Sequence, residues 1–389
     1  MPASRSLPLT VSLVAVSLIL VATFVPVFYS FYAANNHDYV GHYSFAIAIE
    51  DGWRLSIPHI LYHILLILAK NTLGLEDIKE VAVTLQTAFR ILIGLSLFMA
   101  LKTQMGSQLT DALAAIVVLL LMWAAPIYLW FEPPLFLGYI NYLPYHNPTQ
   151  PLMLIFTVPM SLIAWRAVSP QPFTSLNRRI FLMLLSVLIV LLLSLSKPSY
   201  SIALLPALGL VVLYRLIRRL PLDWMLLIVG IGVPVLLMLA LQYLVTYTDM
   251  QRASIGIGWL KFFRVYGFGD SLVFARLALS MVFPVTAYAL HFREARRDDY
   301  LSLSWLVFAV SLIWAYLFYE QGQRADDGNF VWSAYAALFV LMFSTVLFLI
   351  KQYATQPFKR SWRLGLSIAA FSLHFGSSLY AAVRVVAAI

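Results

Sequence analysis

Long apolar runs constrain this chain more than any other feature of its sequence. A helix needs about 20 apolar residues to cross the hydrocarbon layer of a bilayer, and this chain of 389 residues is 62% hydrophobic and only 11% charged. Runs of that length predict eleven spans, at residues 8–31, 80–101, 109–130, 149–168, 180–196, 199–217, 223–246, 271–291, 300–319, 330–350 and 363–386. We therefore expect an all-α polytopic membrane protein, with residues 1–389 forming a single transmembrane domain.

Residues 58–74 are the exception, because Lys70 interrupts their apolar run after about 12 residues, a length more typical of interfacial or re-entrant segments. If this segment does not cross, and the N-terminus is cytoplasmic, every strong basic cluster falls in a cytoplasmic loop, as the positive-inside rule requires. If it did cross, Arg178-Arg179 and Arg296-Arg297 would face outward. We therefore expect the plasma (inner) membrane, a cytoplasmic N-terminus and an outer C-terminus.

The same topology places the polar loops outside. Residues 32–79 form a first outer loop with interfacial helices, and residues 247–270 form an outer amphipathic segment that serves as a mobile cover or, alternatively, as an interface anchor. The net charge of +9 comes from the basic inner loops, so we expect no nucleic-acid partner. The absence of cysteine excludes disulfides, a thiolate nucleophile and Cys-ligated metals.

Titratable residues crowd into the stretch 35–63, at a predicted membrane edge. They are three carboxylates (Asp38, Glu50, Asp51), four histidines (His37, His42, His59, His63) and Arg54. Crowding of this kind in such an apolar chain indicates a site. A metal is not favoured there, because His59 and His63, spaced as a helical ligand pair, lack the intervening Glu of a zincin. We expect no cofactor.

The order of these features resembles the GT-C superfamily of membrane glycosyltransferases. The shared features are a first span ending at an exposed Asp, an amphipathic stretch, a Gly-Trp pair and a Pro-x-x-Leu-Tyr segment on the outer surface. The matching residues are Asp38, Tyr39, His42, Gly52, Trp53, Pro58, Leu61 and Tyr62. The resemblance implies a GT-C-like fold and transfer of a sugar from a polyprenyl-phosphate or polyprenyl-diphosphate carrier on the outer face. The implied partners are the lipid-linked donor, an acceptor glycan, lipid or protein, and membrane lipids.

Transfer from a lipid phosphate requires a base for the acceptor hydroxyl. Asp38 is the first candidate, because a carboxylate at the end of a span is partly desolvated, and His42 or His37 could serve instead. The structural alternative is that Asp38 caps the following helix.

The same reaction requires cations for the leaving phosphate. The candidates on the outer side are Lys197, Arg252, Lys261, Arg264 and Arg324. Lys197 stands out because it lies in a tight Ser-Lys-Pro-Ser turn between two spans, although it could simply snorkel to the lipid headgroups. Arg324, among Glu320, Asp326 and Asp327, has a local ion-pair network as its alternative.

A further set of outer polar residues has an acceptor-binding or a structural interpretation: Glu132, His146, Asn147, Tyr62, His59 and Asn329. For Asn147, followed by Pro148, the structural role of starting a helix is favoured.

Two other functions compete with a glycosyltransferase. A polysaccharide polymerase or ligase would use the same kind of lipid-linked donor. A transporter or flippase would place ionisable residues near the midplane of several spans, whereas here the predicted span interiors are nearly free of charge.

Overall fold

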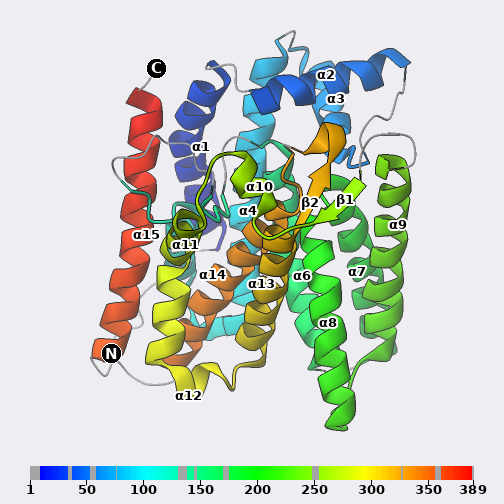
Figure 1. Cartoon of the computed structure of the whole chain (residues 1–389). Helices are drawn as coiled ribbons and strands as arrows, with labels where there is room; N and C mark the ends of the chain where they lie inside the picture. Colours follow the sequence, from blue (N-terminus) through cyan, green and yellow to red (C-terminus); the bar gives the residue numbers. More distant parts are fainter. Residues whose placement is uncertain are drawn as a thin grey trace.

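The computed structural model describes ten apolar helices long enough to cross a membrane (Figure 1). It describes residues 9–33, 37–52, 58–75, 77–129, 138–143, 147–169, 175–247, 254–325, 327–354 and 361–387. The long helices are α1 (Leu9–Ala33), α4 (Ile78–Met105), α6 (Thr149–Val168), α7 (Leu176–Ser196), α8 (Ser199–Ile217), η2 (Met225–Gly232) continuing into α9 (Val233–Tyr247), α11 (Asp270–Leu290), α13 (Asp299–Leu317), α14 (Val331–Ala354) and α15 (Trp362–Ala387). The expected all-α polytopic membrane fold is confirmed.

Helix α14 forms the centre of the bundle. Of its most apolar stretch 89% is buried inside the protein, against 33% for α1, α8 and α15. It packs against α13, α8, α6 and α11. Since a lipid-facing helix keeps one side exposed to hydrocarbon and α14 does not, α14 is the helix around which the others are arranged.

One predicted span is not a single long helix. Residues 109–130 were expected to cross, but α5 (Asp111–Met122) has only 12 residues, about 18 Å at 1.5 Å per residue, against a hydrocarbon layer of about 30 Å. Residues 123–129 are not helical. Pro126 explains the break, because proline disfavours the helical conformation of the residue before it and offers no N–H.

The non-helical segment runs at the depth of the middle of two long helices, which supply its hydrogen bonds. Ala125 N–H donates to the His374 carbonyl of α15 (3.4 Å), and Ile127 N–H donates to the Leu279 carbonyl of α11 (3.2 Å). Irregular backbone at membrane depth is tolerated only where protein surrounds it. Packing against α11 and α15 therefore makes the short α5 possible.

His374, buried in α15, joins the three segments. The N–H of Phe283 in α11 donates to its Nε2 (3.2 Å), so Nε2 is an acceptor and Nδ1 carries the hydrogen. Nδ1 then donates to the Ala125 carbonyl (2.6 Å). Phe283 precedes Pro284, which interrupts the hydrogen bonding of α11. A single side chain thus satisfies backbone groups on both neighbouring segments.

The bundle has two chemically different ends. Helix α2 (His37–Gly52) lies across one of them in Figure 1, so we call it the α2 end. Helix α3 (Leu61–Leu73) runs beside α2 in the same direction, with contacts between His42 and His63 and between Lys70 and Glu50. With 13 residues, α3 is not among the helices of membrane-spanning length, which agrees with the expectation that 58–74 does not span.

The opposite end collects the basic residues. Helix ends and short turns there carry Lys102, Arg166, Arg178, Arg179, Arg215, Arg218, Arg219, Arg293, Arg296, Arg297, Lys351 and Arg363. Several are paired, as in Arg179–Asp223 (2.7 Å) and Lys102–Asp111 (2.7 Å). The structure thus groups at one end the residues that the sequence assigned to one face.

A small two-stranded sheet stands at the α2 end. Strand β1 (Ser254–Ile257) pairs antiparallel with β2 (Phe318–Gln321), with Ser254 opposite Gln321. Helix α10 (Lys261–Val265) follows β1, η3 (Gly322–Arg324) follows β2, and η1 (Gly106–Gln108) and α12 (Phe292–Ala295) are turns at the opposite end. In the described part of the expected 247–270 amphipathic segment, five residues form the short helix α10, and the residues of β1 before it pair with β2 instead.

We expect His374→Phe to destabilise the protein, because it leaves the Ala125 carbonyl and the Phe283 N–H without their partner. A buried polar group left unsatisfied costs about 1–3 kcal/mol. Equilibrium unfolding in detergent measures the loss. Leu373→Ala, at a side chain 57% exposed on the same helix, is the control, with an expected effect of about 0.5 kcal/mol or less. Equal losses in the two variants would contradict the assigned role of His374.

The two ends are also expected to face opposite sides of a membrane. The chain has no cysteine, so Asn71→Cys in α3 and Arg218→Cys after α8, both exposed, introduce single reactive thiols. An impermeant maleimide added to sealed vesicles of one orientation should label one variant, and labelling of the other should require permeabilisation. Labelling of both from one side would show that the polarity of the bundle is wrong.

Candidate functional site

Lys197 lies at the α2 end, in the turn between α7 and α8. Its side chain is 3% exposed, and its Nζ lies 4.4 Å from the centroid of the Trp332 ring at the start of α14. A buried lysine does not snorkel, so the alternative of a charge extended to the headgroups is wrong. Four charged groups act on its ammonium from other segments: Asp38, Asp327, Glu320 and Arg324.

Burial lowers the pKa of Lys197 to about 8, while Asp38, Asp327 and Glu320 oppose that shift. Nearby carboxylates, and not water, therefore stabilise the charged form of Lys197 near neutral pH. A cation held in this way attracts an incoming anion more strongly than an exposed lysine, because solvent screens it less.

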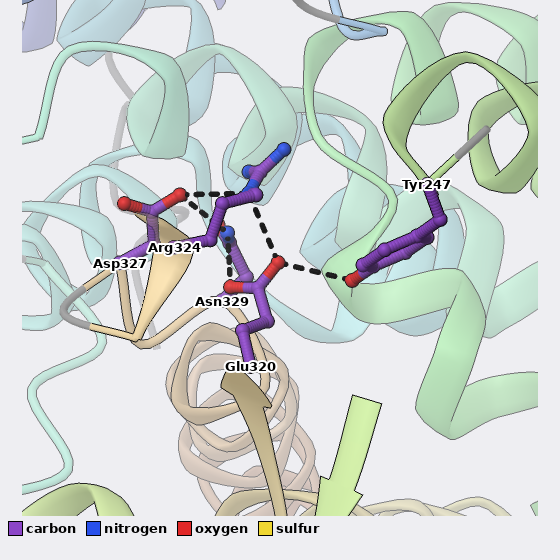
Figure 2. Close-up of polar contacts among 5 residues, drawn as sticks. All are labelled: Tyr247, Glu320, Arg324, Asp327 and Asn329. Carbon is purple, nitrogen blue, oxygen red and sulfur yellow. Dashed lines mark hydrogen bonds and ion pairs between the residues drawn. The ribbon is translucent and has the colours of Figure 1, made fainter. Parts of the chain in front are cut away.

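Arg324, in η3, forms the second cationic group (Figure 2). Its Nε lies 3.1 Å from Glu320 Oε1 and 2.9 Å from Asp327 Oδ2. The Nε hydrogen aligns with neither oxygen, so these contacts are ion pairs and not directed hydrogen bonds. The ion-pair network proposed for Arg324 is confirmed. The end of the guanidinium, with its two terminal nitrogens, is directed away from both carboxylates.

Glu320, 4% exposed, is held by neutral donors on both oxygens. Tyr247 OH, from the end of α9, donates to Oε1 (3.0 Å), and Asn329 Nδ2 donates to Oε2 (2.7 Å). Burial raises the pKa of Glu320, against the opposing effects of Arg324 and Asn329. Burial likewise raises the pKa of Asp327.

Gly328 shapes the loop that carries Asp327 and Asn329. Its φ is +60°, and a Cβ at this position would collide with the Phe262 ring of α10. Only glycine meets both conditions without strain. Phe262, from the aromatic part of the 247–270 segment, thus packs against the loop that carries these two residues.

Helices α2 and α3 bring the remaining candidates to the same place. Asp38 and His42 are four residues apart on α2 and so lie on one face, and both interact electrostatically with Lys197. His42 Nδ1 lies 2.9 Å from His63 Nε2. Burial lowers the pKa of both imidazoles, that of His63 to about 4. This face therefore presents an exposed carboxylate beside neutral histidines.

His59 and Tyr62 lie at the beginning of α3. His59 is 8% exposed, and burial, followed by the charge of Lys197, lowers its pKa. Tyr62 is fully buried, with its ring against those of His63 and Phe89. Burial raises the pKa of the Tyr62 hydroxyl, so it stays protonated and Tyr62 serves as a packing group.

Asn147 has the structural role favoured from its sequence. Its Oδ1 accepts hydrogen bonds from the N–H groups of Thr149 and Gln150 (both 3.2 Å) and from the Thr149 hydroxyl (2.8 Å). These bonds satisfy free donors in the first turn of α6, as helix-capping side chains do.

The structure does not bring Lys261 and Arg264 to this cluster. Both are exposed on α10, and Arg264 is engaged by Asp270 through two bonds of 2.9 and 2.6 Å. Arg252, Glu132 and His146 lie outside the described residues, and only the backbone of His37 is described, at the start of α2. In the described part of the chain, no three His, Asp or Glu side chains gather as a metal would require.

Sequence reasoning missed Tyr247 and Trp332. Tyr247 is the last residue of an apolar helix, where tyrosine is ordinary as an interface anchor, so nothing in the sequence marked it. Trp332 gave no signal for the same reason. A buried lysine in a turn requires a partner, and this requirement alone could have prompted a search for an aromatic ring.

No protein-family model matches this chain, and comparison with curated proteins gives no match. The polytopic all-helical fold is established, and a function has to be argued from the geometry of the site at the α2 end.

Proposed function

We propose that this protein is a membrane glycosyltransferase that takes a sugar from a polyprenyl-phosphate or polyprenyl-diphosphate carrier and transfers it to an acceptor hydroxyl. The observation that supports this most is the gathering of two largely buried cations, Lys197 and Arg324, with Asp38 and His42 at one end of the bundle. Three segments distant in the sequence contribute these groups: α2, the turn between α7 and α8, and η3.

The chemistry assigns each group a task. The acceptor oxygen attacks the anomeric carbon, the bond from that carbon to the phosphate oxygen breaks, and the electron pair stays on the phosphate. Lys197 and Arg324 stabilise the charge that grows there. Asp38 takes the hydroxyl proton, and His42, neutral on the same face of α2, is the alternative acceptor of that proton.

The charge distribution supports an outer site. The basic residues of the opposite end fit cytoplasmic loops under the positive-inside rule. The α2 end then faces outward from the plasma (inner) membrane, where a lipid-linked sugar is presented at the membrane surface. The polar groups of the cluster lie at that end and not along a path through the bundle, which favours an enzyme over a transporter.

The direct test is release of polyprenyl phosphate from radiolabelled polyprenyl-phosphate sugars by the purified protein. Asp38→Asn should reduce turnover about 10²–10⁴-fold, the usual contribution of a general base. Glu50→Gln is the matched control, because Glu50 is a carboxylate on the same helix that pairs with Lys70 at an exposed position. Turnover by Asp38→Asn within about threefold of wild type, well below that range, would return Asp38 to a structural role. Addition of many sugars instead of one would identify a polymerase.

The pKa of Lys197 predicts a pH dependence of donor binding. Above about pH 8 the ammonium loses its proton, so affinity for a polyprenyl phosphodiester, whose charge is constant in this range, should fall between pH 7 and pH 9. Lys197→Arg keeps its charge throughout and should remove this fall. Wild-type affinity that is flat or rises with pH would contradict the assignment.

A further inference from the structure

The direction in which the Arg324 guanidinium points is the feature of this site that most requires a structural explanation. An arginine that binds a carboxylate through its fork uses two parallel N–H groups. Here both Glu320 and Asp327 lie against Nε, on the edge of the group, and the end with the two terminal nitrogens is directed away from them (Figure 2). The two acidic side chains neutralise the arginine without occupying its fork.

Glu320 can hold Arg324 in this direction only if Glu320 itself is fixed. One of its oxygens accepts from Tyr247 OH and the other from Asn329 Nδ2. These donors come from the end of α9 and from the loop before α14, so Glu320 is tied to two helices besides its own strand. Losing either bond would allow the carboxylate to turn toward the guanidinium fork, where a bidentate pair is stronger.

We propose that Tyr247 is a positioning residue that acts with Asn329 to hold Glu320 on the Nε edge of Arg324, so that the fork is presented to a phosphate shared with Lys197. The identity of that anion as the phosphate of a polyprenyl carrier rests on the proposed function. The orienting role of Tyr247 rests on the hydrogen bonds around Glu320.

The chain offers a matched control for the Tyr247 hydroxyl. Tyr243 is one turn earlier on α9, its ring centroid is 5.0 Å from that of Tyr247, and its side chain is 53% exposed. Tyr243→Phe and Tyr247→Phe each remove one hydroxyl and leave the ring. Only the second removes a donor to Glu320.

The experiment measures the dissociation constant of farnesyl phosphate, a short polyprenyl phosphate, with inorganic phosphate and farnesol as separate probes. Wild type is expected to bind farnesyl phosphate more tightly than either. Tyr247→Phe should raise the dissociation constant of farnesyl phosphate about five- to tenfold, which corresponds to one lost hydrogen bond. Tyr243→Phe should raise it less than about twofold. In an Arg324→Met background, Tyr247→Phe should have no further effect, because no guanidinium remains to be oriented.

Asn329→Ala, which removes the other donor to Glu320, gives a second variant with the same expected non-additivity if Tyr247→Phe fails to fold. Wild-type affinity in Tyr247→Phe, or equal losses in the wild-type and Arg324→Met backgrounds, would overturn this inference and leave the proposed function standing. Failure of wild type to bind farnesyl phosphate, or equal binding of inorganic phosphate, would overturn the proposed lipid-linked donor and this inference with it.

Discussion

Hydrocarbon offers no hydrogen bonds, and the structure depends on how each polar group in the bundle meets that constraint. Long helices meet it internally. Where α5 ends early, other segments satisfy the backbone of the non-helical chain that follows. Ala125 and Ile127 donate to carbonyls of α15 and α11, and the imidazole of His374 bonds to both Ala125 and Phe283. Exact pairing of this kind lets non-helical backbone and a proline share the same depth.

Charge is handled differently at the two ends. At the end with the basic loops, the Lys102–Asp111 pair is partly exposed on both sides, and pairs of that kind contribute little to stability. At the α2 end, Lys197 and Glu320 are removed from water, which costs free energy that their pairing recovers only in part. A cluster retained at such a cost, with burial moving the pKa values of Lys197 and Glu320 in opposite directions, is typical of functional sites.

The sequence was informative where one physical rule dominates. Hydropathy predicted the ten long helices, and the interruption at Lys70 kept α3 from being counted among them. Hydropathy failed at α5, because that run is apolar enough to span but Pro126 interrupts its helix, and hydropathy alone takes no account of such a break. Lys197 and Arg324 could be singled out because charges are rare in this chain. Lys261 and Arg264 could not be excluded, because their exposure on α10 and the pairing of Arg264 with Asp270 depend on how α10 packs. Tyr247 has meaning only through Glu320, which lies 73 residues further along the chain.

The position of the cluster follows from the direction of the helices. Lys197 immediately precedes α8, Asn147 precedes α6, and Asp327 and Asn329 precede α14. These three helices pack on one another and all begin at the α2 end. Each helix N-terminus carries a partial positive charge of about one half, so their common origin adds to the field of Lys197 and Arg324. Glu320 and Asp327, which pair with Arg324, oppose that field. Under the proposed function, an arriving anion competes with two carboxylates that burial already makes easier to protonate, and the fixed direction of the Arg324 fork gives the anion the better geometry in that competition.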